Sequence, residues 1–207
     1  MAKRKRDAQR TQEILLETAE RVFVEKGYDG ARVDEIAREA NINKRMIYVF
    51  FGNKEQLYIE VLRSSFKRLF QSHRPSPQPN GNPLGDAIAI LNWYFWFLSE
   101  NPNFVRLLGW ETLHDGRRAG QVLIDLMAEG LGPLQEMIKR GKDEGYFRQD
   151  LAVHKLVTIF HEVCLGFFSR RNLLEVLWAQ DLSDKQNQQE MLDQITKVLF
   201  DGLKSRG

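Results

Sequence analysis

The sequence predicts an all-α protein of about nine helices, with a small N-terminal three-helix domain and a larger C-terminal helical bundle. Apolar residues recur at spacings of three and four along most of the 207 residues, which is the period of helices that bury one face. No segment shows the apolar and polar alternation of a strand between turn signals. One segment, residues 73–83, holds four of the six prolines and separates the two parts.

Four helices are expected before the proline-rich segment. Their expected bounds are residues 7–26, 33–40, 44–51 and 54–71. Gly27 stands where a C-cap glycine ends the first helix, and Tyr28 can fold back on its last turn. A three-residue turn, 41–43, joins the second helix to the third, and Asn53 is expected to cap the fourth.

Five helices are expected in the second part. Their expected bounds are residues 84–100, 102–114, 118–144, 150–177 and 184–203. The first of them is apolar nearly all round at its centre, so it should be buried. Pro102 can open the second, Gly132 and Pro133 interrupt the third, and Asp150 or a neighbour caps the fourth.

Composition restricts the class of protein. Hydrophobic residues make up 43% of the chain and charged residues 28%, which is typical of a folded globular protein. The longest apolar stretch, Trp93 to Leu98, is six residues, whereas a membrane span needs about 18. The basic residues 3–6 are not followed by the apolar core of a signal peptide, so we expect a cytoplasmic protein without a membrane partner. The single cysteine, Cys164, excludes an internal disulfide and a cysteine-rich zinc module.

Charge is divided unevenly between the two parts. Residues 1–74 carry 16 Lys and Arg against 11 Asp and Glu, a net charge of +5, and residues 75–207 carry 14 against 17, a net charge of −3. A basic first third predicts contact with a polyanion, with chance as the alternative. The basic run at residues 3–6 is either a solvated terminus or an arm that follows DNA phosphates.

The helices expected at 33–40 and 44–51 have the arrangement of a helix-turn-helix. Their shared core is expected to consist of Ile36, Ala37, Ala40, Ile42 and Ile47. Asn43 is a suitable N-cap for the second helix, and Lys44 and Arg45 follow it, where a long cation can reach guanine or a phosphate in the major groove. The pattern favours double-stranded DNA as a partner, although two short packed helices also occur in other bundles.

A longer pattern runs from Ala19 to Leu62. Its defining positions are Ala19, Phe23, Gly27, Tyr28, Val33, Ile36, Ala37, Ala40, Ile42, Ile47, Tyr48, Phe51, Lys54, Glu55, Leu57 and Tyr58. This pattern resembles the DNA-binding domain of the tetracycline-repressor-type (TetR) family of regulators. The resemblance implies three N-terminal helices that bind DNA and a larger domain that dimerises and holds a small molecule. With the proline-rich segment, it leads to the expected bounds: a DNA-binding domain at 1–53, a connecting helix at 54–74, a loop at 75–83, and a ligand-binding and dimerisation domain at 84–207.

The resemblance also assigns DNA-contacting residues. The base-facing turn of the family's recognition helix corresponds to Asn43, Lys44, Arg45 and Met46. Tyr48 matches a tyrosine that commonly meets a phosphate, and Lys54 matches a lysine that usually meets the DNA backbone. Arg32 replaces the hydroxyl residue that normally caps the second helix, and its side chain could itself reach a phosphate. Arg45 and Phe50 are further departures from the common pattern, so no operator sequence can be transferred from relatives.

Aromatic and polar residues of the second part predict a site for a small-molecule effector between helices. The expected lining residues are Asn92, Trp93, Trp96, Phe97, Trp110, His114, Phe160, His161 and Cys164. The asparagine and both histidines are polar groups in apolar surroundings and need partners, which a ligand with an apolar or aromatic body and one or two hydrogen-bonding groups would supply. In the alternative, backbone groups satisfy them and the rings fill the core.

The last two expected helices carry more apolar residues than one core needs, which predicts a homodimer with a four-helix interface. On the first they are Leu156, Val157, Phe160, Val163, Cys164, Phe167 and Phe168, and on the second Met191, Leu192, Ile195, Val198, Leu199 and Leu203. The alternative is a monomer that buries both faces internally.

No set of residues supports catalysis, a metal site or a cofactor. His161 and Cys164 share a helix face, but no further Cys or His lies at a metal-binding spacing, and no glycine-rich phosphate loop is present. We therefore predict a non-enzymatic, ligand-responsive transcriptional regulator, a repressor that a small apolar or aromatic molecule releases from its operator. The alternatives are a DNA-anchored regulator controlled by a protein partner, and an enzyme or carrier that uses the helical bundle.

Overall fold

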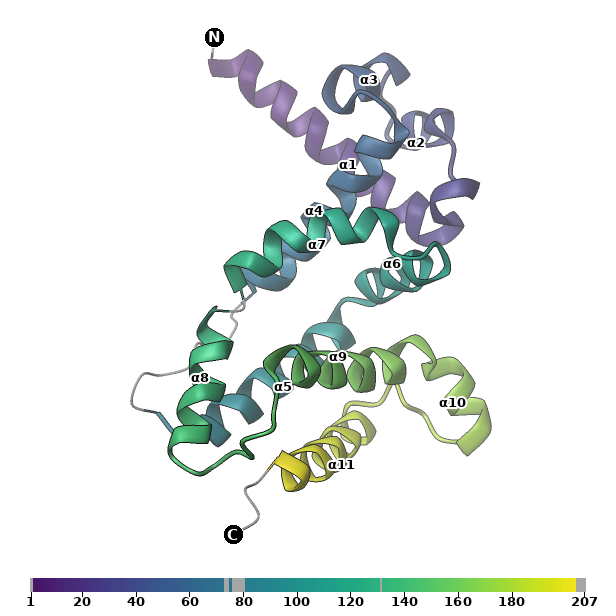
Figure 1. Ribbon diagram of the computed structural model, residues 1–207. Coiled ribbons are helices and arrows are strands. Elements are labelled where there is room, and N and C mark those ends of the chain that lie inside the picture. The colour runs from purple at the N-terminus through teal and green to yellow at the C-terminus, as the bar shows by residue number, and fades with distance from the viewer. Residues whose placement is uncertain (1, 73–74, 76–80, 131, 204–207) are drawn as a thin grey trace. The chain divides into compact units, whose positions relative to one another are not determined.

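The computed structural model describes residues 2–72, 75, 81–130 and 132–203, and every regular element among them is a helix (Figure 1). The helices are α1 (Ala2–Gly30), α2 (Val33–Glu39), α3 (Lys44–Phe51), α4 (Lys54–Gln71), α5 (Pro83–Glu100), α6 (Pro102–Leu113), α7 (Arg117–Gly130), α8 (Gly132–Asp143), α9 (Val153–Ser169), α10 (Arg171–Trp178) and α11 (Lys185–Leu203). The all-α prediction is confirmed, with eleven helices in the described residues rather than about nine. Most of the predicted loop at 75–83 lies outside the described residues.

The contacts within the chain divide it into two units. Unit 1 comprises Met1–Leu69 and Arg106–Leu126, and unit 2 comprises Phe70–Val105 and Met127–Gly207. Helices α6 and α7 therefore each begin in one unit and end in the other. The predicted domain bounds followed sequence order, whereas the contacts group the segment 106–126 with the N-terminal helices.

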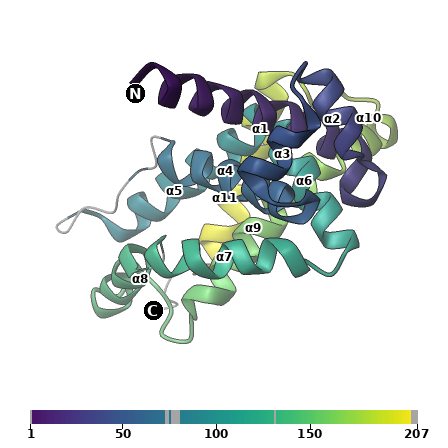
Figure 2. The same cartoon turned by 90° about the horizontal axis from the view of Figure 1, so that it is seen from above.

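Unit 1 is built on the apolar face of α1. Leu15, Ala19 and Phe23 of this face are completely buried, because spacings of four residues keep them on one side of the helix. Helix α2 packs against both α1 and α3, and Figure 2 shows the two short helices, α2 and α3, side by side. The helix-turn-helix therefore rests on a rigid apolar support.

Gly27 ends the regular part of α1, as the sequence predicts. Its backbone has φ 68° and ψ 178°, a conformation that essentially only glycine adopts. Tyr28 then lies back against Phe23, with ring centroids 6.4 Å apart and 13° between the planes. A Cβ atom on Gly27 would lie 2.9 Å from the ring of Trp110, which comes from α6. The glycine is therefore required both for its backbone conformation and for space.

The segment from α6 and α7 is held in unit 1 by buried polar contacts. The indole Nε1 of Trp110 donates to the carbonyl of Val24 at 3.1 Å. Glu111 is buried, and its Oε2 accepts a hydrogen bond of 2.8 Å from the backbone N–H of Ala119 in the first turn of α7. A carboxylate at this position satisfies a free amide of the helix start and fixes where α7 begins.

Helix α5 is the central helix of unit 2 and packs against α8, α9 and α11. Leu91, Phe95 and Leu98 are buried, and the ring of Phe95 stacks on Phe167 of α9 with centroids 5.7 Å apart. These contacts confirm the prediction that the apolar helix at 84–100 is buried.

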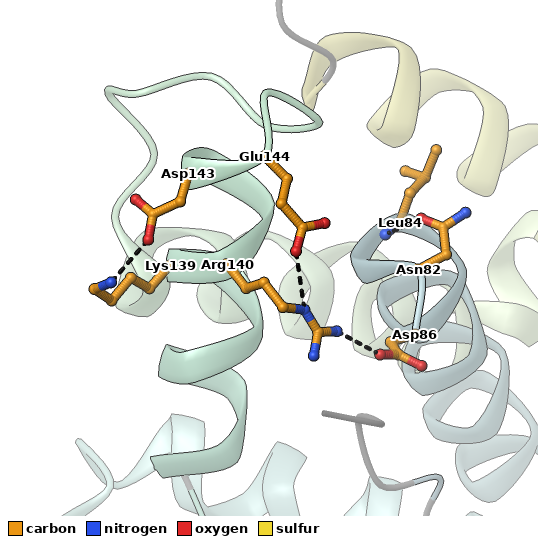
Figure 3. A network of polar contacts seen from close by, with 7 residues as sticks. All are labelled: Asn82, Leu84, Asp86, Lys139, Arg140, Asp143 and Glu144. Atoms are coloured by element: carbon orange, nitrogen blue, oxygen red, sulfur yellow. Dashed lines mark hydrogen bonds and ion pairs between the residues drawn. The ribbon is translucent and has the colours of Figure 1, made fainter. Parts of the chain in front are cut away.

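A polar network joins α8 to the first turn of α5 (Figure 3). Nη2 of Arg140 donates to Oδ2 of Asp86 at 3.1 Å, and its Nε lies 3.9 Å from Oε1 of Glu144. Asn82 caps α5 by accepting a hydrogen bond from the N–H of Leu84 at 3.0 Å. Arg140 and Asp86 are both largely buried, so this ion pair lies in a poorly solvated place, where removal of either partner is costly.

The prediction of one long helix over 150–177 is wrong, because Arg170, with φ −108° and ψ 8°, separates α9 from α10. Asp150 or a neighbour was expected as the N-cap, and the N-cap residue is Ala152, which makes no side-chain cap bond. The carboxylate of Asp150 is instead engaged by the guanidinium of Arg148, whose Nε donates to Oδ1 at 2.9 Å. That ion pair lowers the pKa of Asp150 and raises that of Arg148.

Candidate DNA-binding surface and effector site

The turn between α2 and α3 presents the first turn of α3 on the surface of unit 1. Ile36 of α2 and Ile47 of α3 are completely buried and hold the two helices together. Oδ1 of Asn43 accepts a hydrogen bond of 2.9 Å from the N–H of Arg45, which confirms Asn43 as the N-cap. The start of α3 is thus fixed both by packing and by a cap.

Lys44 and Arg45 are both exposed on that first turn. Nζ of Lys44 lies 2.7 Å from Oδ1 of Asp34 on α2, and this hydrogen-bonded pair raises the pKa of Lys44. The side chain of Arg45 has no hydrogen-bond or ion-pair partner among the described residues. Its guanidinium is therefore available for a base edge or a phosphate. Lys44 would have to break its ion pair with Asp34, or keep it while also contacting DNA.

Three further predicted DNA contacts lie near these two residues in the chain. Tyr48 is exposed one turn further along α3, with Nζ of Lys44 5.9 Å from its ring centroid, and Met46 is half-buried. Arg32 occupies the N-cap position of α2 in an extended conformation, is exposed and makes no side-chain cap bond. An arginine there leaves the amides of α2 uncapped by a side chain but adds a cation to the surface.

Lys54 begins α4 and is half-buried. Oδ1 of Asn53 accepts a hydrogen bond of 2.9 Å from the N–H of Gln56, so the predicted cap of this helix is confirmed. Nζ of Lys54 lies 4.5 Å from the ring centroid of Tyr28, and burial lowers the pKa of the lysine. No carboxylate forms an ion pair with Lys54 in the part of the chain that the structure describes.

Seven of the nine predicted effector residues lie in unit 2, on α5 and α9. They are Asn92, Trp93, Trp96, Phe97, Phe160, His161 and Cys164. Nδ1 of His161 lies 2.6 Å from the hydroxyl of Tyr94. Burial lowers the pKa of His161 and raises that of Tyr94, so both groups are neutral and share one hydrogen bond, whose direction depends on the imidazole tautomer. Sequence reasoning missed Tyr94, because 67 residues separate it from its partner and no local signal connects them.

The other polar members of this set have partners inside the protein. Nδ2 of Asn92 donates to the carbonyl of Ile88 at 2.8 Å, and Nε1 of Trp93 donates to Oγ of Ser72 at 3.0 Å. Cys164 is completely buried, which raises the pKa of its thiol to about 12. The aromatic members contact rings or cations of unit 2: Trp96 meets Phe95 and Lys185, Phe97 meets Phe104, and Phe160 meets Phe200.

Trp110 and His114, the remaining two predicted effector residues, lie in unit 1. Trp110 covers Gly27, as described above, and Nε2 of His114 lies 3.7 Å from Oδ2 of Asp29. The contacts that the structure describes for these two residues are therefore with the N-terminal helices.

In the described part of the chain, no three His, Cys, Asp or Glu side chains are grouped closely enough to hold a metal ion. None of the helices in that part is both long enough and apolar enough to cross a membrane.

Two protein families match the chain. The family described as "Bacterial regulatory proteins, tetR family" matches residues 15–61, and "Tetracyclin repressor-like, C-terminal domain" matches residues 86–199. The HTH-type transcriptional repressor NicS of Pseudomonas putida is 32% identical over 204 residues, which cover 97% of this chain and 96% of NicS.

Solved structures share the fold. The fatty acid degradation regulator FadR of Bacillus halodurans superposes with a TM-score of 0.70 at 22% identity, covering 94% of this chain and 97% of that one. The ketosteroid transcriptional regulator KstR2 of Mycobacterium tuberculosis superposes with a TM-score of 0.65 at 23% identity, covering 94% and 95%.

The chain therefore belongs to the TetR family of helix-turn-helix transcriptional regulators. It is thus a transcriptional regulator of a family whose members bind DNA and are not enzymes, which confirms the class predicted from the sequence.

Proposed function

We propose that a homodimer of this chain represses transcription by placing α3 of each protomer in a major groove, and that a small apolar or aromatic molecule bound in unit 2 releases it. The observation that carries the DNA-binding geometry is Arg45, which is exposed, unpaired among the described residues and fixed at the start of α3 by Asn43. A long cation at this position can form two hydrogen bonds to guanine.

Substitution of Arg45 tests this geometry. Arg45→Ala should weaken binding to the operator by about 1–3 kcal/mol if the side chain pairs with guanine. Lys67→Ala removes the same charge from an exposed position of α4 and serves as the matched control. The measurement is fluorescence anisotropy with a duplex that the wild-type protein selects from random DNA. Equal, small losses in both variants would contradict the proposed docking.

Exposed apolar side chains support the dimer. Ile159 and Val163 of α9 and Val198 of α11 are exposed, the last by 71%. These helices belong to the segments for which the sequence predicts a four-helix interface. Leu192 and Ile195 of the predicted stripe are buried within the protomer, so they serve its core, and the side chain of Leu203 lies outside the described part.

The pair of Tyr94 and His161 supports an effector site in unit 2. In the tautomer in which Nδ1 accepts from Tyr94, Nε2 of His161 carries the proton, and it has no partner among the described residues. This N–H can donate to a carbonyl or carboxylate of the effector, while the aromatic rings of α5 contact its apolar body.

A compound screen tests the effector site. Small apolar and aromatic compounds are tested for release of the selected duplex and for quenching of tryptophan fluorescence. A compound that releases the wild-type protein should act only at higher concentration on His161→Gln. An unchanged midpoint in that variant would contradict a role for His161.

A protein partner is the second candidate controller, because α10 exposes an apolar surface. Leu173, Val176, Leu177 and Trp178 are all exposed, and α10 buries none of its residues. A reporter repressed by Leu173→Glu/Val176→Glu should respond to inducing compounds like the wild type if the effector is a small molecule. Loss of induction in this variant, with repression intact, would favour the protein partner.

A further inference from the structure

The ring of Tyr28 is shared by two cations. Nζ of Lys54 lies 4.5 Å from the ring centroid, and Cζ of Arg118 lies 3.7 Å from it. The ring itself is held in place, because its edge contact with Tyr58 has centroids 5.3 Å apart and it stacks on Phe23. Tyr28 is thus a fixed platform on which a lysine and an arginine are both attracted to the π face.

Arg118 reaches this platform from the first turn of α7, 64 residues beyond Lys54 in the chain and outside the segment that matches the N-terminal family. The buried cap that Glu111 forms with Ala119 places Arg118 on unit 1. Its side chain is only 22% exposed, and its Nε lies 3.7 Å from Oε1 of Glu55. Arg118 therefore forms a long ion pair, without a hydrogen bond from its Nε, with the acid that follows Lys54 in the sequence.

These contacts leave Lys54 in an unusual state for a surface cation. It is partly desolvated, which lowers its pKa; the negative charge of Asp29 raises that pKa, and the positive charge of Arg118 lowers it. No carboxylate forms an ion pair with Lys54 among the described residues, and Arg118 is the cation that lies near Glu55. A partly desolvated ammonium that forms no ion pair within the protein gains more from a phosphate than a solvated or paired ammonium does.

We propose that Arg118 is a positioning residue for DNA binding: it pairs with Glu55, so that Lys54 remains over Tyr28 and available to a DNA phosphate. The proposal rests on the proposed docking, in which Lys54 meets the DNA backbone. Arg118 itself makes no contact with DNA in this account. Because α7 passes from unit 1 into unit 2 after Leu126, Arg118 belongs to a helix that has residues in both units.

A double-mutant cycle on the full-length protein tests the proposal. Binding to the selected duplex is measured by anisotropy at several salt concentrations for Lys54→Gln, Arg118→Gln and the double variant. Lys54→Gln should reduce the magnitude of the slope of log K against log salt by about 1.8 per dimer, because each of its two phosphate contacts contributes about 0.9. Arg118→Gln should lower it by the same amount and weaken binding about tenfold, and the double variant should lose nothing further.

Arg117→Gln is the matched control, because Arg117 is the adjacent residue, carries the same charge and is 82% exposed. It should leave both affinity and slope unchanged. Arg118→Lys keeps a cation for Tyr28 and should retain the wild-type slope, which a loss of folding would not explain. Circular dichroism identifies any variant that fails to fold. If Arg118→Gln does not fold, the salt dependence of Arg118→Lys is compared with that of Lys54→Gln instead.

Three results would overturn the proposal. Additive losses in the double variant would make Arg118 an independent phosphate contact, and a wild-type slope in Arg118→Gln would remove its role altogether. Both of these results leave the docking of Lys54 intact. An unchanged slope in Lys54→Gln would instead overturn the docking itself, and the positioning role with it.

Discussion

The two units use polar side chains in opposite ways. In unit 1, Arg45 in the first turn of α3 and Arg32 at the N-cap of α2 are exposed. The buried faces of these two helices are apolar. In unit 2, Asn92 and His161 are directed to a carbonyl and a phenol of the protein. The first arrangement leaves cations available to an external polyanion, whereas the second satisfies polar groups inside a bundle of aromatic rings.

This difference explains why residues can be assigned to the DNA-binding surface more readily than to the effector site. A DNA-binding surface needs only a short rigid motif with cations at its start, and all of that is local in the sequence. An effector site needs side chains from helices far apart in the sequence. The capped turn before α3 therefore supports a definite docking, while the rings of α5 and α9 serve equally as core and as lining.

The largest expected effect lies in unit 2, at the proposed dimer interface. Val163→Glu/Val198→Glu places two unpaired charges per chain in a contact that would otherwise be apolar, which should weaken the dimer by about 3–5 kcal/mol. Sedimentation velocity at micromolar concentration should then show monomers. Gln189→Glu adds one negative charge per chain at an exposed polar position of α11 and should remain dimeric. A stable dimer of the double variant would move the interface elsewhere.

Gly27→Ala should produce the next largest effect, in unit 1. The new Cβ meets the ring of Trp110 at 2.9 Å in a backbone conformation that disfavours alanine, so the free energy of unfolding should fall by about 3 kcal/mol. Gly52 also has a positive φ, of 80°, but nothing within 4 Å of a Cβ, so Gly52→Ala should cost only about 1–2 kcal/mol. Denaturant unfolding measures both, and equal losses would show that Trp110 does not restrict this position.

Gly141→Ala is the corresponding substitution in unit 2. The helix gains about 1 kcal/mol from alanine, but the Cβ would overlap the buried ring of Phe147, and displacing that ring costs about 1–3 kcal/mol. A net loss of about 1 kcal/mol is expected in denaturant unfolding. Gly120→Ala in α7 has nothing within 4 Å of the added atom and should be slightly stabilising. A stabilised Gly141→Ala would mean that Phe147 moves freely.

The smallest effect concerns the pH dependence of stability. Burial lowers the pKa of His161 in the folded state, so the unfolded state binds more protons as the pH falls. Its contribution to stability is therefore present above the ordinary histidine pKa near 6.5 and is lost as the pH falls below it. The free energy of unfolding should decrease less between pH 7 and pH 5 in His161→Gln than in the wild type. Identical pH profiles would exclude a buried neutral His161.

Much of the fold could be predicted from the sequence, because its signals are local. Gly27, Asn43 and Asn53 end or cap helices through contacts within a few residues, and each performs the predicted role. The break at Arg170 could not be predicted, since neither glycine nor proline marks it. Asp150 or a neighbour was expected as a cap, and the pattern did not reveal that Arg148, two residues away, engages the carboxylate of Asp150.

In the candidate sites too, features local in the sequence could be predicted, and contacts between distant segments could not. The exposure of Lys44 and Arg45 follows from the helix-turn-helix, but the ion pair between Lys44 and Asp34 depends on how α2 and α3 pack. The partnership of Tyr94 with His161, and the position of Arg118 over Tyr28, depend on contacts between distant segments. Periodicity contains no information about such pairs.

The most direct test of the account is selection of duplexes from random DNA by the wild-type protein and by Arg45→Ala. A dimer that places α3 of each protomer in a major groove should select a palindrome with two half-sites about one helical turn apart. Arg45→Ala should select the same palindrome with the preference for one guanine per half-site lost. A wild-type site without two-fold symmetry, or the same bases selected equally strongly by Arg45→Ala, would contradict the proposed docking of α3.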